Sequence, residues 1–306
     1  MKLTRRKLIE SAAGVGVVSL ASGWGGLLSA AEPLIRVTIP SSGEQVPAVG
    51  IGTNHFRGDP TSDQMQPYIQ TLEKFHSLGG RVIDTSPNYG NSEEVLGRLL
   101  AGMGVSKKMF MATKVDREDG PQGEQRMESS FGRLGGGIDL MQVHNLRGTD
   151  VQLKTMQAWK EEGRFKYIGV TTHRVEQHSE MESIMRKYPL DFIQVNYSLA
   201  DRASADRVLP LAQDRGIAVL VNRPYANGRL FKAVKGVALP DWAADIDAQS
   251  WGQVFLKFII SHPAATIPIP GTTKPHHAED NMGAMKGRLP DAGLRKEMAG
   301  FIDSLV

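Results

Sequence analysis

Eight short apolar segments rich in β-branched residues recur along the chain, and segments with helical periodicity separate most of them. The eight segments begin near Ala48, Arg81, Met109, Ile138, Phe165, Asp191, Ile217 and Thr266. Their spacing is mostly about 25 to 33 residues, which is the size of one βα unit. This recurrence predicts a (β/α)8 barrel, an α/β fold, with a doubly wound sheet as the alternative.

The end of the first apolar segment distinguishes these two folds. A doubly wound sheet usually carries a glycine-rich phosphate loop and then a helix after its first strand. The chain instead reads GIGTN at 50–54, with no third glycine and no immediate helix. We therefore expect the barrel, preceded by a hairpin that starts at 34–39 and followed by a C-terminal helix over 292–305. The predicted helices between the strands include 65–78, 93–100, 151–162, 180–186 and 203–213, and 225–248 is predicted as a long loop at the top face of the barrel with local structure of its own.

Residues 1–31 differ in composition from the rest of the chain. A twin arginine at Arg5 and Arg6 precedes an uncharged, glycine-rich run over 11–31, and small residues occupy 29–31. This layout is typical of an export signal, and the arginine pair resembles the bacterial twin-arginine (Tat) type. We expect the Tat machinery as a partner, cleavage after Ala31 and a periplasmic location. An uncleaved membrane anchor is the alternative. No linker divides 32–306, which predicts a single domain.

The charge and the absence of cysteine exclude several classes of function. The chain has 36 basic and 33 acidic residues, and the leader holds four of the former and one of the latter, which leaves 32 of each. A net charge of zero gives no electrostatic reason to bind nucleic acid. The chain has no cysteine, so a disulfide, a thiolate metal site and a lipoprotein anchor are excluded.

Reactive side chains follow three neighbouring strands at the points where they end. In a barrel of this kind, catalytic residues lie at the carboxyl ends of the strands. The second strand ends at Asp84, with Tyr89 in the next turn, the third ends near Lys114, and the fourth ends at His144. Pro87 stiffens the turn before Tyr89. Asn91 and Glu94 have the spacing of a capping box for the following helix.

These four residue types suit the reduction of a carbonyl group. A phenol has an ordinary pKa of about 10, and a lysine ammonium beside it favours the phenolate. A carboxylate can hold that ammonium, and a neutral imidazole can donate a hydrogen bond to the carbonyl oxygen. The hydride must come from a cofactor such as a nicotinamide, because side chains cannot supply it.

The residues and their surroundings resemble the aldo-keto reductases, from the hairpin to about residue 285. The matching motifs are GIGT at 50–53, IDTSPNYGNSEEVLG at 83–97, TKV at 113–115, IDLMQVH at 138–144, IGVTTH at 168–173, QVNYSL at 194–199 and IPGTTKPHHAEDN at 269–281. The resemblance implies that Tyr89 is the general acid and base, Lys114 its partner, Asp84 the anchor of the lysine and His144 the residue that orients the carbonyl. The implied reaction is the NAD(P)H-dependent reduction of an aldehyde or ketone, or its reverse.

The resemblance also implies a cofactor site. Gln194 matches the family's contact to the nicotinamide carboxamide, Thr171 and Thr172 stand where many relatives have Ser-Asn, and Asn222 replaces a bulky residue that packs on the nicotinamide. The expected cofactor-binding residues are Gly52, Thr53, Thr171, Thr172, Gln194, Asn222, Arg223, Gly271, Thr272, Lys274, His277, Asp280 and Asn281.

The predicted 2′-phosphate site departs from the family. Relatives use an arginine and often a lysine there, and the matching positions are His277 and Gly271. Thr272, Lys274 and the following helix N-terminus remain as phosphate contacts. We therefore expect NADP(H) to be preferred and NAD(H) to be accepted. We expect no metal at His276 and His277, because adjacent helical residues point in different directions and no third ligand is evident.

A second class of function remains open. The chain also resembles the potassium-channel beta subunits, which suggests a regulatory, nucleotide-binding barrel. The changes at Asn222, Gly271 and His277 favour altered cofactor use, whereas the complete set of four reactive residues favours catalysis on a small carbonyl or alcohol.

Overall fold

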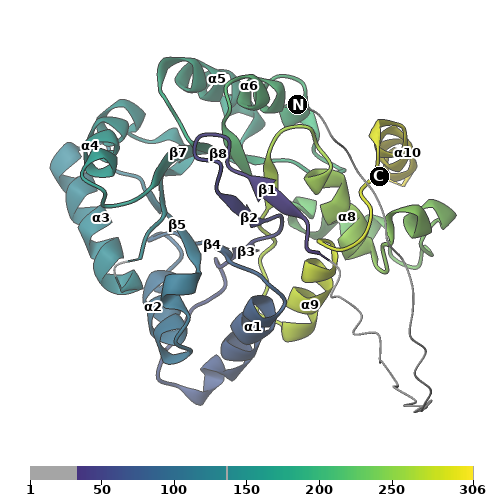
Figure 1. Ribbon diagram of the computed structural model, residues 1–306, viewed down its shortest axis with the longest axis horizontal. Coiled ribbons are helices and arrows are strands. Elements are labelled where there is room, and N and C mark those ends of the chain that lie inside the picture. Colours follow the sequence, from purple (N-terminus) through teal and green to yellow (C-terminus); the bar gives the residue numbers. More distant parts are fainter. Residues whose placement is uncertain (1–32, 136, 306) are drawn as a thin grey trace, which may run out of the picture. The chain divides into compact units, whose positions relative to one another are not determined.

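The computed structural model describes residues 33–135 and 137–305, so the predicted export signal and its cleavage site lie outside the described residues. Within them, eight parallel strands pair in chain order, and helices form a ring around them (Figure 1). The strands are β3 (Ile51–Gly52), β4 (Val82–Asp84), β5 (Phe110–Val115), β6 (Leu140–Val143), β7 (Tyr167–Thr171), β8 (Phe192–Asn196), β9 (Ala218–Asn222) and β10 (Thr266–Pro268).

The first and last strands meet and nearly close the sheet. The backbone N–H of Gly50 donates to the Pro268 carbonyl at 2.9 Å, and that of Gly52 donates to the Pro270 carbonyl at 3.2 Å. A parallel bridge between Gly52 and Gly271 continues this seam. The predicted (β/α)8 barrel is confirmed, and the doubly wound alternative is wrong because an open sheet would leave these edges apart.

Helices lie at the predicted positions with small differences at their ends, and others, such as those over 120–134 and 251–260, were not among those predicted. They are α1 (Gln66–Ser77), α2 (Ser92–Gly102), α3 (Gly120–Leu134), α4 (Thr149–Glu161), α5 (His178–Lys187), α6 (Val208–Asp214), α7 (Arg229–Ala233), α8 (Trp251–Ile260), α9 (Pro275–Gly283) and α10 (Ala292–Asp303). The predicted helix over 203–213 is interrupted, since a 3₁₀ turn at Ala203–Ala205 precedes α6. The predicted loop 225–248 contains α7 and two 3₁₀ segments.

The start of α2 differs from the predicted capping box. Asn91 is the N-cap residue, but its side chain makes no capping hydrogen bond. Its amide exchanges two hydrogen bonds with the backbone of Gly58, at 2.7 and 3.2 Å. Glu94 pairs with Arg98 one turn later. The Asn91 side chain thus bonds a loop that is distant in sequence, and it does not cap α2 as the local pattern predicted.

Alternation along the strands separates an apolar layer inside the barrel from a polar one. Because successive side chains of a strand face opposite sides, every second residue points inward. At the amino ends of the strands these residues form an apolar cluster that includes Val82, Phe110, Leu140, Tyr167 and Phe192. The larger apolar cluster lies between the strands and the helices.

The hairpin β1 (Arg36–Thr38) and β2 (Gln45–Pro47) covers this apolar end of the barrel. Ile39 and Val46 are buried in the inner cluster. The hydroxyl of Tyr167 donates to Glu44 Oε2 at 2.7 Å, which ties the hairpin turn to a barrel strand. The opposite end of the barrel is therefore the open one.

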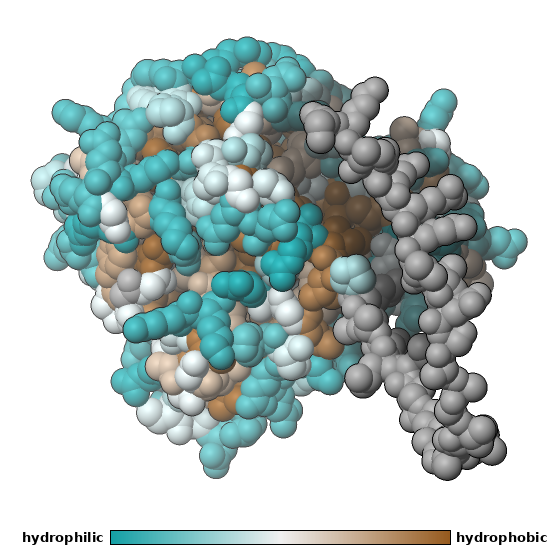
Figure 2. Space-filling model, viewed as in Figure 1, coloured by the Kyte–Doolittle hydropathy of each residue, from teal (hydrophilic) through white to brown (hydrophobic). Residues whose placement is uncertain are grey.

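Figure 2, viewed as in Figure 1, shows that hydrophilic side chains cover most of the outer helices, with smaller hydrophobic areas between them.

None of the helices among residues 33–135 and 137–305 has the length and apolar character needed to cross a membrane.

Candidate active site

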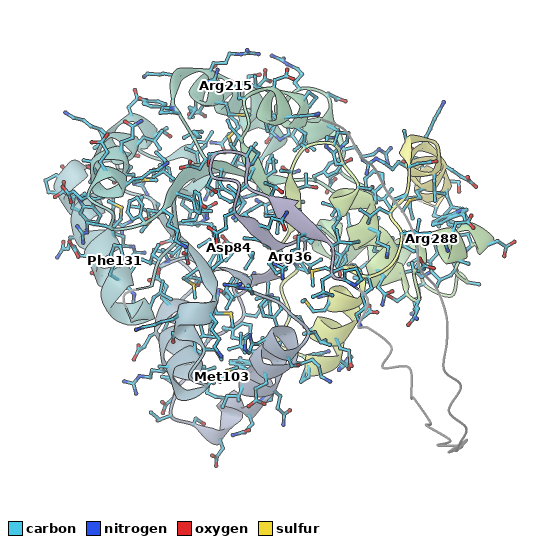
Figure 3. The ribbon with its side chains drawn as sticks, in the orientation of Figure 1. Arg36, Asp84, Met103, Phe131, Arg215 and Arg288 are labelled. Atoms are coloured by element: carbon cyan, nitrogen blue, oxygen red, sulfur yellow. The ribbon has the colours of Figure 1, made fainter. Side chains whose placement is uncertain are left out.

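A pocket of about 610 Å³ opens at the carboxyl ends of the strands. Asp84 lies near the centre of the ring of helices, whereas Met103 and Phe131 lie toward its edge (Figure 3). The predicted site residues that line the pocket are Gly52, Thr53, Asp84, Tyr89, His144, Thr171, Thr172, Gln194, Asn222, Arg223 and Gly271. The predicted residues outside its lining are Lys114, Thr272, Lys274, His277, Asp280 and Asn281.

Lys114 lies under the pocket floor and pairs with Asp84. Its Nζ donates to Asp84 Oδ2 at 2.6 Å and to the Thr85 carbonyl at 2.8 Å, and both side chains of the pair are almost fully buried. Burial alone would lower the pKa of Lys114, but the neighbouring Asp84 and Tyr89 raise it above its ordinary value. The lysine is therefore charged at neutral pH, in a place where an isolated ammonium would be unstable.

Asp84 accepts further hydrogen bonds from two glutamines. Asp84 Oδ1 accepts from Gln194 Nε2 at 2.8 Å and from Gln142 Nε2 at 3.2 Å. Gln194 lines the pocket as expected, but its amide nitrogen is used by Asp84, and β8 runs two residues beyond it. Gln142 was not among the predicted site residues. Its inward direction follows from the alternation that also turns Leu140 inward, so the signal was present.

Tyr89 stands above the lysine in the turn between β4 and α2. The backbone N–H of Tyr89 donates to the Ser86 carbonyl at 3.0 Å, and the Tyr89 carbonyl accepts from the Ser92 N–H at 3.2 Å. These bonds fix the turn from both sides. Lys114 Nζ lies 5.1 Å from the centroid of the Tyr89 ring. An ammonium has three protons, and since two are given to Asp84 and Thr85, the third is left on the side of the phenol.

His144 begins the 3₁₀ turn His144–Leu146 directly after β6 and faces Tyr89 edge-on. The two ring centroids are 6.1 Å apart and the ring planes are nearly perpendicular. Burial, followed by the charge of Lys114, lowers the pKa of His144 to about 3. The imidazole is therefore neutral over the physiological range and is available as a hydrogen-bond donor to an uncharged carbonyl oxygen.

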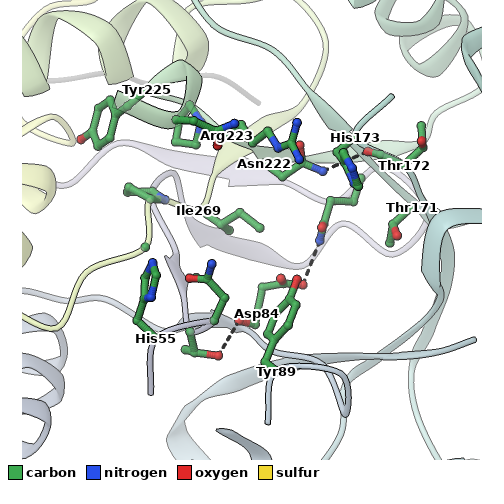
Figure 4. A pocket seen from close by; sticks show the side chains of 18 of the residues that line it. His55, Asp84, Tyr89, Thr171, Thr172, His173, Asn222, Arg223, Tyr225 and Ile269 are labelled. Atoms are coloured by element: carbon green, nitrogen blue, oxygen red, sulfur yellow. Dashed lines mark hydrogen bonds between the residues drawn. The ribbon is translucent and has the colours of Figure 1, made fainter. Parts of the chain in front are cut away.

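The opposite wall carries amide and hydroxyl groups. Asp84 and Tyr89 point across the pocket toward Asn222 and His173 (Figure 4). Asn222 Nδ2 donates to the Thr172 carbonyl at 3.0 Å, whereas the buried Asn222 Oδ1 has no hydrogen-bond partner among the described residues. A buried acceptor without a partner at the edge of a pocket suits a donor group of a ligand.

Two loops at the pocket mouth adopt left-handed backbone conformations. Asn145 follows β6 with a φ of 55°, and Arg223 and Asn227 follow β9 with φ of 50° and 54°. This conformation is unfavourable for residues other than glycine and is concentrated at functional sites. Arg223 is exposed at the rim of the pocket. The arginine therefore stands where an anionic part of a ligand could reach it.

The predicted adenosine side of the site is partly occupied by contacts within the protein. Asp280 accepts from Ser250 Oγ at 2.8 Å and from Gln253 Nε2 at 3.0 Å, and Asn281 accepts from the hydroxyl of Tyr225. These bonds join α9 to α8 and to the loop after β9. Lys274 and His277 remain exposed. No group of three or more His, Asp or Glu side chains in the described part of the chain could hold a metal ion.

The comparison with protein families decides the assignment. The model of the aldo/keto reductase family matches residues 48–296. The chain belongs to the aldo/keto reductase family. This confirms the predicted family and, with it, the predicted class of NAD(P)-dependent oxidoreductase.

Several curated proteins are similar to this aldo/keto reductase over most of its length. An uncharacterized oxidoreductase, C215.11c, of Schizosaccharomyces pombe is 29% identical over 77% of this chain and 80% of its own. The aldo-keto reductase yakc [NADP(+)] of the same yeast is 26% identical and covers 83% of this chain and 88% of its own. An NADH-specific methylglyoxal reductase of Escherichia coli is 25% identical over 83% and 95%.

A solved structure shares the fold. The aldo-keto reductase of Klebsiella pneumoniae in complex with NADPH superimposes with a TM-score of 0.71 over 89% of this chain and 95% of its own, at 23% identity. At this identity the likeness supports the barrel, and the chemistry of the site has to be argued from the residues of this chain.

Proposed function

We propose that this aldo/keto reductase reduces an aldehyde or ketone with NAD(P)H, and that Tyr89 is its general acid. The observation that carries the proposal is the arrangement of Asp84, Lys114 and Tyr89, which runs from the barrel interior to the pocket floor, with neutral His144 beside the phenol. A substrate carbonyl oxygen that gains negative charge during reduction would lie beside a proton donor, Tyr89, and a hydrogen-bond donor, His144.

Each residue has a distinct part in the proposed reaction. His144 donates a hydrogen bond to the carbonyl oxygen and holds it near Tyr89. The nicotinamide, when bound, supplies the hydride for the carbonyl carbon. The Tyr89 hydroxyl gives its proton to the oxygen, and the resulting phenolate is stabilised by the Lys114 ammonium. Asp84 keeps that ammonium charged and in place. In the reverse direction the phenolate accepts the proton of an alcohol.

The residues of the pocket fit a nicotinamide nucleotide. The orphaned Asn222 Oδ1 can accept a hydrogen bond from a carboxamide N–H₂ group. Gly52 and Gly271 line the pocket, and a Cβ at 52 would lie 2.8 Å from the Ile269 carbonyl oxygen, so a glycine is needed there for the close approach of the first and last strands. Arg223 at the rim can pair with a diphosphate. Exposed Lys274 precedes α9, whose N-terminus favours a further phosphate.

NADP(H) is the proposed cofactor, with NAD(H) accepted. The only basic side chains near the start of α9 are Lys274 and the two histidines, among the described residues 269–283. Partial burial and the neighbouring His276 and Lys274 lower the pKa of His277, so this exposed side chain adds little positive charge at neutral pH. A site with one lysine favours a 2′-phosphate only modestly. Relatives named for NADP(+) and for NADH both occur at similar identity.

The test is a binding measurement followed by a turnover measurement. The purified protein is titrated with NADPH and NADH, and the oxidation of bound NADPH is then followed with a panel of aldehydes and ketones. Binding together with turnover supports the proposal. Binding without turnover of any carbonyl would favour the regulatory barrel instead, and the absence of binding to either nucleotide would overturn both.

Export by the Tat route is part of the proposal, and it is supported by Arg5, Arg6 and the uncharged run over 11–31. Nicotinamide cofactors are made in the cytoplasm, and the Tat route carries folded proteins. We therefore expect the protein to leave with its cofactor bound and to retain it tightly. Replacing both arginines by lysine should keep the protein in the cytoplasm. Export that persists in this variant, or periplasmic protein without nucleotide, would contradict the proposal.

A further inference from the structure

The ring nitrogen of His144 that faces away from the ligand has two close neighbours. Ser86 Oγ lies 3.2 Å from His144 Nδ1, and Asn88 Nδ2 lies 3.5 Å from the same atom. Both residues belong to the turn that carries Tyr89. Ser86 is fully buried, and both side chains lie within 3.5 Å of the ring of a proposed catalytic residue.

The orientation of the Asn88 amide is fixed by charged partners on both sides. Arg126 Nη2 donates to Asn88 Oδ1 at 2.7 Å, and Asn88 Nδ2 donates to Asp116 Oδ2. A guanidinium can only donate and an ionised carboxylate can only accept. Asp116 is also paired with Arg117 at 2.6 Å. The amide nitrogen, a donor, therefore faces His144.

The hydroxyl of Ser86 can donate to the same nitrogen of His144. Ser86 Oγ already accepts the backbone N–H of Asn88 at 3.1 Å. Its own hydrogen is therefore free to be donated to His144 Nδ1. Among the described residues, Nδ1 thus meets the Asn88 amide nitrogen, which can only donate, and the Ser86 hydroxyl, which can donate to it or accept from it. A neutral imidazole in this position is most stable with Nδ1 unprotonated and its proton on Nε2.

We infer that Ser86 and Asn88 are positioning residues that hold His144 in the tautomer with its proton on Nε2. Since His144 lines the pocket and turns Nδ1 to the Tyr89 turn, Nε2 is the nitrogen left for a ligand. The wrong tautomer would present a lone pair to the carbonyl oxygen and repel it. This inference rests on the proposed function, and it gives the turn a second task besides holding Tyr89.

The surroundings of His144 allow a variant that replaces the hydrogen-bond donor beside Nδ1 by an acceptor. Asn88→Asp has nearly the same shape but replaces the donor by an acceptor. It also gives up the hydrogen bond to Asp116 Oδ2 and places a second carboxylate beside that one, with Arg126 and Arg117 as the nearby positive charges. The charged or titratable groups that face His144 are Tyr89, Lys114, Asp116, Arg126 and His173. Only the two carboxylates, at 116 and at the substituted 88, would favour a proton on Nδ1. We expect Asn88→Asp to shift His144 to the Nδ1–H form.

The direct experiment is ¹⁵N NMR of the histidine side chains in the full protein, with His144 assigned by its loss in His144→Gln. The wild type should show an unprotonated Nδ1 and a protonated Nε2 at neutral pH. Asn88→Asp should place the proton on Nδ1, and Ser86→Ala should give a mixture. A wild-type His144 with its proton on Nδ1 would overturn the inference, as would an unchanged tautomer in both variants.

Kinetics provide the second readout. Loss of one preorganised donor lowers kcat by about 10²- to 10³-fold, so Asn88→Asp should lower kcat by about 10²-fold and Ser86→Ala by about tenfold. Asn88→Asp should also add a break to the pH profile as His144 becomes protonated. The controls are Gln213→Glu and Ser183→Ala on distant exposed helix positions. If no carbonyl is turned over, the proposed function fails, but the NMR result still decides the tautomer.

Discussion

Lys114 Nζ lies 5.1 Å from the centroid of the Tyr89 ring and gives two of its three protons to groups below it. This relationship connects the barrel interior to the pocket. Asp84, on β4, is bonded to the lysine, to Gln142 on β6 and to Gln194 on β8. The Lys114 ammonium, which comes from β5, is thus held in place by side chains of three other strands. A cation on a rigid support beside a phenol is what proton transfer at neutral pH requires.

Removing the lysine should destabilise the protein as well as inactivate it. Lys114→Met leaves the buried Asp84 without its ammonium, and we expect the free energy of unfolding to fall by about 3–5 kcal/mol. The additional substitution Asp84→Asn should recover part of this loss, because the orphaned charge is gone. Chemical denaturation measures both. As a control, Lys187→Met breaks an exposed pair with Asp150 and should change the free energy of unfolding far less than Lys114→Met does. Equal costs for the buried and the exposed pair would contradict this view.

Stability should fall as the pH is lowered, in part because of His144. Its folded pKa is about 3, below the ordinary 6.5, so the unfolded state binds a proton that the folded state refuses. The part of the folding stability that depends on a neutral His144 is fully present above about pH 6.5 and is lost as the pH falls toward 3. His144→Gln should therefore lose less stability than the wild type between pH 7 and 4.5. His262, with a pKa near 4, contributes equally to both proteins. Parallel stability curves would show that His144 does not titrate as described.

The cofactor preference should depend on Lys274. Replacing this exposed lysine by methionine should weaken NADP(H) binding about tenfold, the low end for a charge-assisted hydrogen bond. NAD(H) lacks the 2′-phosphate and should bind as before. Calorimetric titration of both nucleotides gives the comparison, and Lys107→Met, on the short helix before β5, is the matched control. Equal weakening for the two nucleotides would assign Lys274 a role other than 2′-phosphate recognition.

Regular patterns in the sequence were sufficient to predict the barrel and the place of the four reactive residues. Strand alternation and the rule that parallel strands end on one side place Asp84, Lys114 and His144 at one rim, and the structure brings them together with Tyr89. These predictions succeeded because they depend on local periodicity and on the chain order of the strands, both of which are visible in a single sequence.

Contacts between distant segments could not be predicted in the same way. Asn91 was expected to cap α2, but its amide pairs with Gly58, which is 33 residues away. Gln194 was expected to contact a cofactor and does line the pocket, but the bond from its amide nitrogen to Asp84 across the barrel was not expected. In each case the side chain has two chemically reasonable partners, and only the three-dimensional arrangement shows which one is closer. The donors beside His144 were missed for the same reason.

The most direct test of the account is the carbonyl reductase activity of Tyr89→Phe. The substitution removes one hydroxyl and keeps the ring, so the fold and nucleotide affinity should be unchanged. General acid catalysis contributes about 10²- to 10⁴-fold, and kcat should fall by that amount. Tyr188→Phe removes a hydroxyl that bonds Asp150 on the surface and should leave kcat unchanged. If Tyr89→Phe lowers kcat no more than Tyr188→Phe does, Tyr89 is not the proton donor and the account is contradicted.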